Sequence, residues 1–558
     1  MIRLLNKKSN SILIAGIVIG VGGILSRVLG LVRDRIFAYQ FGAGIELDIY
    51  YAAFRIPDFI YAVLIMGAVS AAFIPVFSGL LKNNVLFEED KIKENSEAHK
   101  LGVGILNIFT FGVGIISLIL FIFAPLLVRI IAPGFSDGEM INLTILLTRV
   151  MLIQPILLSA STIITGMLHS FNRFIITSLS PVMYNLGIII GAVFFTPVFG
   201  VFGLAYGVIL GALLHFAIQI PALIEIGFKW RPWFNFNLKN TKLVFKLMLP
   251  RAFGIMGHQI NFIVITAIAS TLAIGSIAIF NFANNIQYVP VSLIGITLAT
   301  AAFPTLSKKF SNEHKQEFLI TFTTVFKNIL FLGLPLSILF IILRAQIVRV
   351  ILGTGRFDWQ DTQLTAAALG IFGISVFAQT LIPIITKAFY SSKNTKTPAF
   401  ITLGAVILNI VLSFYFVEIL SKHGAFYQYI VERLHLIGVS GAEILGLPIA
   451  FSISAIIQFL ILIFIFVQHF DKETLNALSK SWLKILASSA VLGITTYYAL
   501  RPLSQILDMK TGLGIFLQGI GAGIAGILVY LITSYLLKSE ELKNILSKIK
   551  FLSTKKTL

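Results

Sequence analysis

Cysteine is absent from this chain of 558 residues, and acidic residues are scarce, with only 24 Asp and Glu. The absence of cysteine excludes a disulfide framework, a thiol nucleophile and a thiolate metal site. Charged residues make up 12% of the chain, about half the share of a typical soluble domain, whereas 57% of the chain is hydrophobic. Together with a mean hydropathy of +0.93, this composition predicts a membrane protein.

Long apolar runs fill most of the sequence, and a membrane-spanning helix needs about 20 such residues. The runs are separated by charged or turn residues, which predicts an all-α integral membrane protein with about fourteen transmembrane helices. The predicted ranges are 11–40, 47–80, 101–131, 140–169, 175–199, 203–226, 243–272, 276–306, 318–343, 363–388, 397–418, 443–468, 481–500 and 511–537.

Basic residues are unevenly distributed between the loops. If the N-terminus is inside, the inner segments carry 28 Lys and Arg and the outer loops carry eight, with the remaining seven of the 43 inside helices. Because inner loops of membrane proteins are enriched in Lys and Arg, we expect both termini to be cytoplasmic. The net charge of +19 is then explained by attraction to anionic membrane lipids, so no nucleic-acid partner is expected.

The two ends of the chain need separate interpretation. Arg3, Lys7 and Lys8 precede the first apolar run, as in a signal peptide, but no small-residue cleavage site ends that run. We therefore predict a retained first helix. At the other end, helical spacing of apolar residues among lysines predicts a basic amphipathic cytoplasmic tail over 538–558, with Leu542, Ile545, Leu546 and Ile549 on its apolar face.

Three segments of the first half recur in the second half at offsets of about 220 to 230 residues. AAFIPVFS at 71–78 recurs as AAFPTLS at 301–307. Six helices are thus duplicated in one order and, because six is even, in one orientation, as in transporters built from parallel repeats. We predict two lobes around a central cavity, at 1–226 and 243–468, with two further helices at 481–537. The other repeated pairs are 127–135 with 347–357 and 169–189 with 390–411.

The stretch from Arg27 to Asp58 places charges inside apolar runs. A charge near the bilayer centre costs roughly 2.5–3.5 kcal/mol on insertion scales, so this cluster needs a compensating role. We expect it to face an aqueous cavity and hold an anionic ligand, because arginine donates paired hydrogen bonds to phosphate. The candidate residues are Arg27, Arg33, Asp34, Asp48 and Arg55, with Arg35 and Asp58 beside them.

A structural alternative stays open for the same cluster. The charges could pair with one another, or those at the helix end could reach the membrane interface, and for Arg35 and Asp48 this alternative is preferred. Proline lacks an N–H and clashes with the preceding turn, so Pro57 predicts a kink or opening of the second helix near Arg55. Broken helices at membrane depth often line transport sites.

Two other arginines and a glycine row lie within apolar runs. Arg251 could face the cavity from the second lobe, or it could anchor the chain at the inner interface. Arg149 predicts a polar contact between helices. A glycine at every fourth position lets two helices approach closely, which is the role we expect for Gly203, Gly207 and Gly211.

The sequence SRVLGLVRDRIFAYQFGAG at 26–44 resembles the MurJ (MviN) family of bacterial lipid II flippases, within the multidrug/oligosaccharidyl-lipid/polysaccharide exporter superfamily. The resemblance continues over the whole chain, through LDIYYAAFRIPD, LPRAFGIMGHQIN at 249–261, NFANNIQYVP at 281–290 and YSSKNTKTP at 390–398. It implies flipping of undecaprenyl-diphosphate-linked disaccharide-pentapeptide to the outer leaflet by alternating access in the bacterial cytoplasmic membrane, for peptidoglycan synthesis.

The resemblance also implies roles for particular residues. Arg27 and Arg33 match cavity arginines, Asp34 and Asp48 match acidic positions, and the last two helices match a groove for the polyprenyl tail. Contact with the cell-wall synthesis machinery is a further expectation. The chain departs from the family in its second and eighth helices, where Tyr61, Ala62, Met66 and Asn285 stand at positions that are charged in many members. Arg55 and Arg251 are the candidates to replace those charges, and Asn285 is itself a candidate substrate-binding residue.

Other functions remain as alternatives. The alternative most similar to lipid II flipping is export of another polyprenyl-linked saccharide, such as an O-antigen or teichoic precursor. A drug antiporter fits less well, because arginines outnumber acids in the cluster. We find no catalytic motif, metal-ligand set or cofactor-binding motif, so neither an enzyme nor a cofactor is expected. The outer loop 419–442 contains His423, Glu432 and His435 but reads as a surface helix, and a purely structural scaffold is the remaining possibility.

Overall fold

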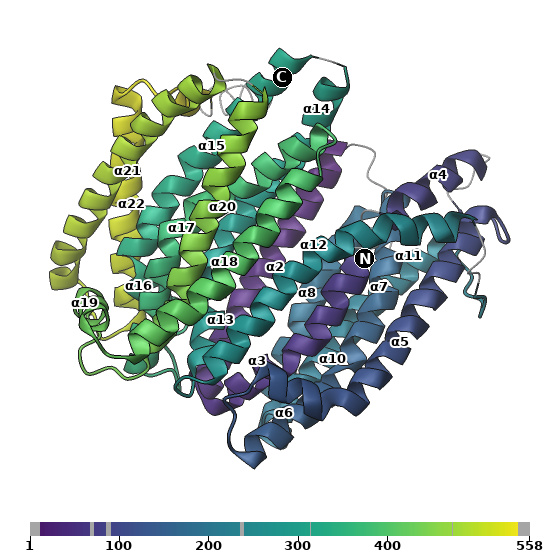
Figure 1. Ribbon diagram of the computed structural model, residues 1–558, viewed down its shortest axis with the longest axis horizontal. Helices are drawn as coiled ribbons and strands as arrows, with labels where there is room; N and C mark the ends of the chain where they lie inside the picture. The colour runs from purple at the N-terminus through teal and green to yellow at the C-terminus, as the bar shows by residue number, and fades with distance from the viewer. Residues whose placement is uncertain are drawn as a thin grey trace. The chain divides into compact units, whose positions relative to one another are not determined.

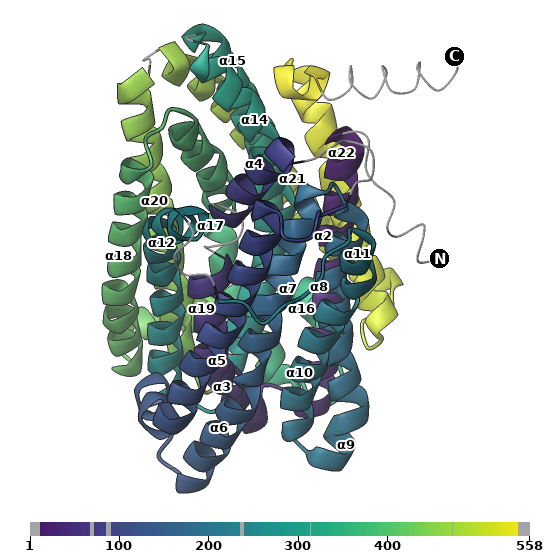
Figure 2. The same ribbon diagram turned by 90° about the vertical axis from the view of Figure 1, so that its right-hand side faces the viewer.

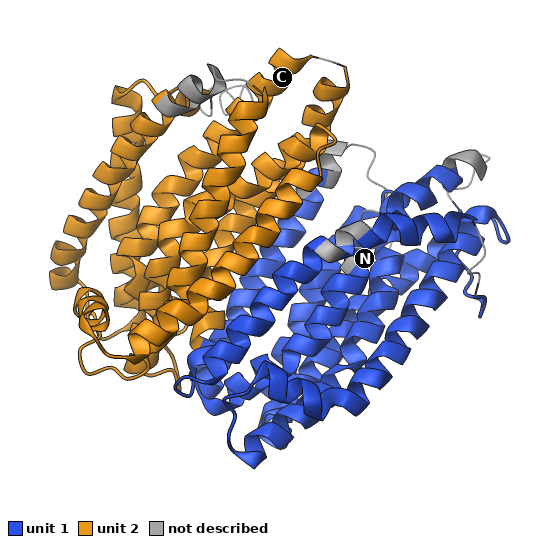
Figure 3. Cartoon of the chain, viewed as in Figure 1, with its two compact units in different colours: residues 1–278 blue, residues 279–558 orange. Residues whose placement is uncertain are grey.

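The computed structural model describes residues 12–66, 72–84, 91–234, 239–312, 314–470 and 473–544. Within these ranges every regular element is a helix (Figure 1). The helices gather into two compact units, Met1–Ala278 and Ile279–Leu558 (Figure 3). The predicted all-α membrane fold is therefore confirmed.

Eleven helices of the described residues are long and apolar enough to cross a membrane, and α12 (Lys239–Ser270) makes a twelfth if its two bent halves form one span. The first two predicted spans correspond to α2 (Ile12–Phe41) and to α3 (Ile45–Ile60) with the π-helix η1 (Tyr61–Met66). The predicted count of fourteen is compatible with this arrangement.

The remaining elements follow the predicted ranges closely. The first unit also contains α4 (Ile74–Asn84), α5 (Glu97–Ile131), α6 (Gly138–Met151), α7 (Ile153–Ser170), α8 (Phe174–Ile190), η3 (Gly191–Phe195), α9 (Thr196–Phe199), α10 (Phe202–Ala217) and α11 (Ile220–Glu225). The second unit contains most of α13 (Ser276–Pro290), then η4 (Val291–Ile296), α14 (Thr297–Ser311), α15 (Lys315–Ile342), α16 (Arg344–Ile351), α17 (Trp359–Ser391), α18 (Lys396–Ser421), α19 (Ala425–Leu434), η5 (Ala442–Leu445), α20 (Gly446–Phe470), α21 (Glu473–Ile506) and α22 (Gly512–Leu536).

α5 illustrates why lipid must cover this protein. Its most apolar window has a mean hydropathy of 2.7, yet only 22% of that window is buried. Ile115, Leu118 and Ile122 are all more than 60% exposed along the helix. A continuous apolar face of this kind is costly in water and favourable in hydrocarbon.

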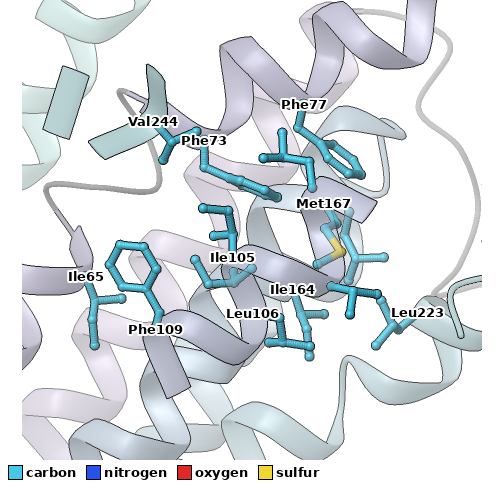
Figure 4. Packing of buried hydrophobic residues seen from close by; sticks show 14 of the residues in the cluster. Ile65, Phe73, Phe77, Ile105, Leu106, Phe109, Ile164, Met167, Leu223 and Val244 are labelled. Carbon is cyan, nitrogen blue, oxygen red and sulfur yellow. The ribbon is translucent and has the colours of Figure 1, made fainter. Parts of the chain in front are cut away.

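Each unit has its own apolar core. In the first unit, Phe77 of α4, Ile105 of α5, Met167 of α7 and Leu223 of α11 meet in one cluster (Figure 4). The core of the second unit is dominated by phenylalanine, and the rings of Phe322 on α15 and Phe466 on α20 lie 4.1 Å apart between centroids. Such separate cores allow each unit to hold its own packing.

The glycine row packs α10 directly against α8 and η3 (Figure 2). A Cβ built on Gly207 would lie 2.8 Å from the Cα of Gly191, and one on Gly211 would lie 2.4 Å from the carbonyl oxygen of Tyr184. These distances leave no room for a side chain, so the predicted close approach of two helix backbones is confirmed.

The internal repeat is visible in the local structure of each half. The π-helical segments η1 and η4 begin 230 residues apart, at Tyr61 and Val291. Near the end of the same helices, Ser78 donates a hydrogen bond to Ser170 (2.9 Å), and Ser307 is bonded to Ser391 (3.2 Å). Both pairs lie within the repeated segments found in the sequence, so the duplication extends to individual hydrogen bonds.

The second helix differs from the prediction at Pro57. The α-helix continues through Arg55 and Pro57 to Ile60, and the irregular π-helical turn begins only at Tyr61. Proline leaves the carbonyl group four residues earlier without its usual donor, and the hydroxyl of Thr148, which donates to the carbonyl oxygen of Thr144 at 2.8 Å, lies 3.4 Å from this carbonyl oxygen of Ala53. The helix therefore does not open at Arg55, and the irregular turn lies four residues beyond Pro57.

Three further predictions concern the outer loop, the boundary between the lobes and the C-terminal tail, and only the first of them is confirmed. The outer loop 419–442 contains the surface helix α19, none of whose residues is buried, as predicted. The two compact units divide at Ala278, so α12 packs with the first unit, and the lobes at 1–226 and 243–468 remain a prediction from the repeat. Residues 545–558 lie outside the described residues, so most of the amphipathic tail also remains a prediction.

Candidate functional site

Arg33 and Asp34 form an ion pair in the C-terminal half of α2. The Nε and Nη2 atoms of Arg33 donate to Oδ1 of Asp34 at 3.0 and 2.8 Å. The Asp34 side chain is 2% exposed and that of Arg33 is 21% exposed. The acid is thus enclosed, whereas the guanidinium group retains an accessible edge.

Asn185 of α8 holds this arginine from a second helix. Its Oδ1 accepts from Nη1 of Arg33 at 3.4 Å, and its Nδ2 donates to the hydroxyl of Ser26 at 3.1 Å and to the carbonyl oxygen of Pro181 at 3.1 Å. An amide that both accepts from and donates to α2 fixes the orientation of the guanidinium plane, which the ion pair alone would leave free to rotate.

The other two arginines of α2 differ from Arg33 in their surroundings. Arg27 and Arg35 are both exposed, whereas Arg33 is half-buried between them. Arg27 lies seven residues before Asp34, about 10 Å along the helix axis. The adjacent Arg33 donates two hydrogen bonds to Oδ1 of Asp34.

Asp48 caps the beginning of α13. Its Oδ2 accepts the backbone N–H of Gly275 at 2.7 Å, and its Oδ1 accepts that of Ala278 at 2.8 Å. The carboxylate is 4% exposed and lies at the positive end of a helix dipole. Gly275 has φ +90°, and a Cβ there would lie 2.0 Å from the carbonyl oxygen of Ala43, so only glycine fits this approach. Asp48 therefore fastens the start of α3 to the start of α13.

Arg55 is bound by α12. Its Nε donates to the hydroxyl of Thr266 at 2.7 Å, and its guanidinium carbon lies 5.4 Å from the ring centroid of Phe262. The charge of Asp58 acts on Arg55 from one turn further along α3. Arg55 thus combines a hydrogen bond, a cation–π contact and a nearby acid.

Neutral polar groups continue the site along α7 and α8. The hydroxyl of Tyr61 lies 3.4 Å from that of Thr162, and Nε2 of Gln154 donates to the hydroxyl of Tyr184 at 3.2 Å. Gln154 is 1% exposed, and its Oε1 has no hydrogen-bond partner among the described residues. The first unit thus presents paired charges beside a set of hydroxyl and amide groups.

The two remaining candidates lie elsewhere in the chain. Asn285 is half-buried on α13, where Asn281 and Gln287 are buried on the same helix. Arg251 belongs to the helix α12, but its side chain lies outside the described residues. Within the described residues, no group of three His, Cys, Asp or Glu side chains gathers as a metal site would require. The structure leaves the ligand-binding roles of all seven candidates as predictions.

Sequence reasoning missed Asn185, Thr266, Tyr184 and Gln154. Asn185 and Gln154 are single amides in long apolar runs, so burial within lipid could have drawn attention to them. Thr266 carries no such signal, because threonine is common in membrane helices and satisfies itself on the preceding turn. Its hydroxyl does bond back to Phe262 at 2.8 Å. Arg149, in contrast, bonds the carbonyl oxygen of Phe121 at 3.1 Å between α6 and α5, as predicted.

The apolar helices, the duplicated elements and the charged second helix define a multi-span transporter fold. Among solved structures, an inward-facing multidrug resistance transporter of the MATE family in the MOP superfamily aligns with a TM-score of 0.60 at 16% identity, over 78% of this chain and 93% of that one. This likeness shows the fold alone.

The chain belongs to the lipid II flippase MurJ family, whose family model matches residues 37–511. The lipid II flippase MurJ of Burkholderia cenocepacia is 28% identical over 409 residues, which cover 72% of this chain and 77% of that protein. A Borreliella burgdorferi relative of the same family name is 30% identical over 410 residues, covering 72% and 78%. A structure of lipid II flippase MurJ in an inward closed conformation aligns with a TM-score of 0.73 at 27% identity, over 93% of this chain and 98% of that chain.

Proposed function

We propose that this protein flips lipid II, the undecaprenyl-diphosphate-linked disaccharide-pentapeptide, from the inner to the outer leaflet by alternating access, as a transporter rather than an enzyme. Membership of the MurJ family supports the proposal. The observation that carries it in this chain is the half-buried Arg33 within the long apolar helix α2, oriented by Asp34 and Asn185. These contacts hold the guanidinium group of Arg33 in one orientation, ready to bind an anionic headgroup.

The chemistry of a diphosphate fits this arrangement. A guanidinium group stays charged at any physiological pH and donates in a planar fork, which matches two phosphate oxygens. Asp34 offsets the cost of keeping Arg33 in a low-dielectric site when no ligand is bound. Arg55, seated on Thr266 and Phe262, supplies a second guanidinium on the neighbouring helix α3.

The lipid tail and the membrane orientation belong to the same proposal. α21 and α22 pack on each other and expose long apolar side chains, including Ile494, Tyr498, Leu528 and Ile532, each more than half exposed. These helices are our proposed groove for the polyprenyl chain. Both termini lie in the cytoplasm of a bacterial cell, and the protein acts in the cytoplasmic membrane for peptidoglycan synthesis, where contact with the synthesis machinery is expected.

Complementation tests the proposal. A strain depleted of its own flippase is supplied with the wild type, Arg33→Ala, Arg27→Ala or Arg35→Ala, and lipid II exposed on spheroplasts is measured. We expect rescue by the wild type and by Arg35→Ala, whose exposed side chain is not one of the arginines that the family resemblance assigns to the cavity, and no rescue by the other two. Unchanged translocation in Arg33→Ala and Arg27→Ala would exclude the proposed roles of these arginines.

A second candidate is export of another polyprenyl-linked saccharide. It is favoured by the neutral pairs Tyr61–Thr162 and Tyr184–Gln154, because hydroxyl and amide groups bind sugars without requiring a particular charge. Failure of the wild type to expose lipid II, combined with export of an O-antigen or teichoic precursor in a matching depletion strain, would select this candidate.

A further inference from the structure

The segment from Phe228 to Phe234, with the sequence FKWRPWF, forms an ordered strap on the outside of α5. His99 donates from Nε2 to the carbonyl oxygen of Lys229 at 2.8 Å. Further along α5, Nδ2 of Asn107 donates to the carbonyl oxygens of Arg231 (2.7 Å) and Trp233 (2.8 Å). We use the name strap for residues 228–234 from here on.

A single buried amide carries most of this attachment. Asn107 is 1% exposed, and its Oδ1 also accepts from Nε1 of Trp230 at 2.8 Å, so both its donor and acceptor atoms serve the strap. At the far end the ring of Phe234 packs edge-on against that of Phe111, with centroids 5.1 Å apart. The strap therefore follows α5 over about three turns and cannot be a loosely exposed loop.

The length of α5 gives the depth of the strap in the membrane. Its 35 residues extend about 52 Å, whereas the hydrocarbon core is about 30 Å thick. Polar residues at its first turn and Arg129 at its last turn bound an apolar run that begins after Lys100. His99 therefore lies at the polar end of α5, just before the apolar run, and Asn107 lies about two turns inside that run, so the strap starts at the edge of the hydrocarbon core.

The strap presents aromatic rings and positive charge outward. Trp230 is 58% exposed and Phe234 is 47% exposed. The side chain of Lys229 is 69% exposed and that of Arg231 is 41% exposed. Exposed Lys91 and Lys93 lie on the adjoining segment, which is joined to the strap's approach by the hydrogen bond from Ile92 N to the Ile226 carbonyl oxygen (2.8 Å). Tryptophan beside basic residues is typical of the interface with anionic lipid.

One acid competes for this charge. Glu94 forms ion pairs with both Lys229 and Arg231. Hydrogen bonds from Lys229 and then Arg231 hold the pKa of Glu94 below its usual range, so it remains charged at neutral pH. Glu94 therefore occupies donors that a lipid phosphate would otherwise use.

We propose that the strap binds the headgroup of an anionic phospholipid, with Lys229 and Arg231 contacting the phosphate region and Trp230 and Phe234 entering the interface. Nothing in the proposed transport of lipid II requires this site. It fixes the start of the connection between the sixth and seventh helices to the inner surface of the membrane, where the Lys and Arg distribution places these residues.

Headgroup-selective quenching of tryptophan fluorescence tests the proposal. The full-length protein is reconstituted into vesicles that contain brominated phosphatidylglycerol or brominated phosphatidylcholine at equal mole fraction. We expect stronger quenching by the brominated phosphatidylglycerol, and loss of the excess in Lys229→Gln/Arg231→Gln, with apparent preference reduced about tenfold. Equal quenching by the two lipids in the wild type would overturn the proposal.

Matched variants separate lipid binding from a purely structural role. Glu94→Gln frees Lys229 and Arg231, so it is expected to raise the preference for phosphatidylglycerol, whereas loss of a merely structural ion pair would lower it or leave it unchanged. Trp230→Phe keeps an aromatic ring and removes the more exposed of the two tryptophans of the strap, so it should lose most of the excess quenching. The control Lys422→Gln/Arg433→Gln, on exposed basic residues of the predicted outer side, must retain the preference. Its loss in this control would also contradict the proposal.

Discussion

The second and eighth helices are copies of one another that have diverged in chemistry. Each contains an α-helix, a π-helical segment beginning at Tyr61 or Val291, and a second α-helix that ends on a serine hydrogen bond. At an offset of 230 residues, the first copy has Arg55 where the second has Asn285. The duplicated backbone has been kept, while the charges have been retained in only one copy.

The prolines of the two copies show whether a proline sets the position of the π-helical segment. Pro57 lies four residues before η1, whereas Pro290 lies immediately before η4. The π-helical segments nevertheless begin at equivalent positions. The irregular turn is therefore a property of the duplicated helix and its packing, and it is not placed by a single proline.

The largest effect is expected at the ion pair between Arg33 and Asp34 on α2, the helix that precedes the charged copy. Arg33→Ala removes the two hydrogen bonds that Arg33 donates to the enclosed Asp34, and we expect a loss of about 3 kcal/mol in stability together with loss of translocation. The double variant Arg33→Ala/Asp34→Ala should recover most of the melting temperature but no transport. Recovery of lipid II flipping in the double variant would make the pair purely structural.

Asp48 tests the attachment of the α3 start to Gly275 and Ala278 within the first unit. Asp48→Ala leaves two backbone N–H groups of the α13 start unsatisfied and removes an anion from its positive end, so we expect a loss of about 2–3 kcal/mol. The exposed cap Asp137, which accepts from Glu139 N, serves as control, and its alanine variant should lose about 1 kcal/mol or less. Equal shifts in melting temperature would contradict the buried role of Asp48.

Arg55→Asn makes the first copy resemble the second at one position. The variant loses the hydrogen bond to Thr266 and the contact with Phe262, for which we expect about 1–2 kcal/mol and a several-fold fall in translocation. Thr266→Val removes only the acceptor and should keep more activity. If both variants flip lipid II as the wild type does, Arg55 does not replace the charge absent at Asn285.

Variants of the two serine pairs should show the smallest losses of stability, and the losses in the two copies should be similar. Ser78→Ala and Ser307→Ala each remove one hydrogen bond at equivalent positions, and each should cost about 1 kcal/mol or less. Thermal melting of the two variants in the same detergent measures the difference. A large effect in one copy alone would show that the duplicated bond has acquired a separate role there.

Much of the fold could be predicted from the sequence because membrane crossing requires length and hydropathy that are visible residue by residue. The glycine row and Arg149 were predictable for the same reason, since small residues and single charges stand out in apolar runs. The role of Asp48 was not predictable in detail, because its partners are backbone groups of Gly275 and Ala278, and a backbone donor has no sequence signature. The place of the irregular turn could not be predicted from Pro57, because the second copy forms the same turn with its proline at a different position.

The site could be predicted less completely than the fold. The charges between Arg27 and Asp58 indicated where to look, but the partners that orient them, Asn185 and Thr266, come from helices more than 150 residues away in sequence. Pairing between distant side chains depends on the packing of the whole unit, which no local pattern encodes.

The seam between α8, η3 and α10 has a consequence for how this gene can vary. A Cβ added at Gly191 would lie 2.2 Å from the Cα of Gly207, and one at Gly187 would lie 2.3 Å from the Cα of Gly211. Every substitution of these glycines adds at least a Cβ atom. We therefore expect no single substitution at these positions to be tolerated. The arginines, tyrosines and amides of the site can therefore vary in sequence while the glycines that join these helices stay constant.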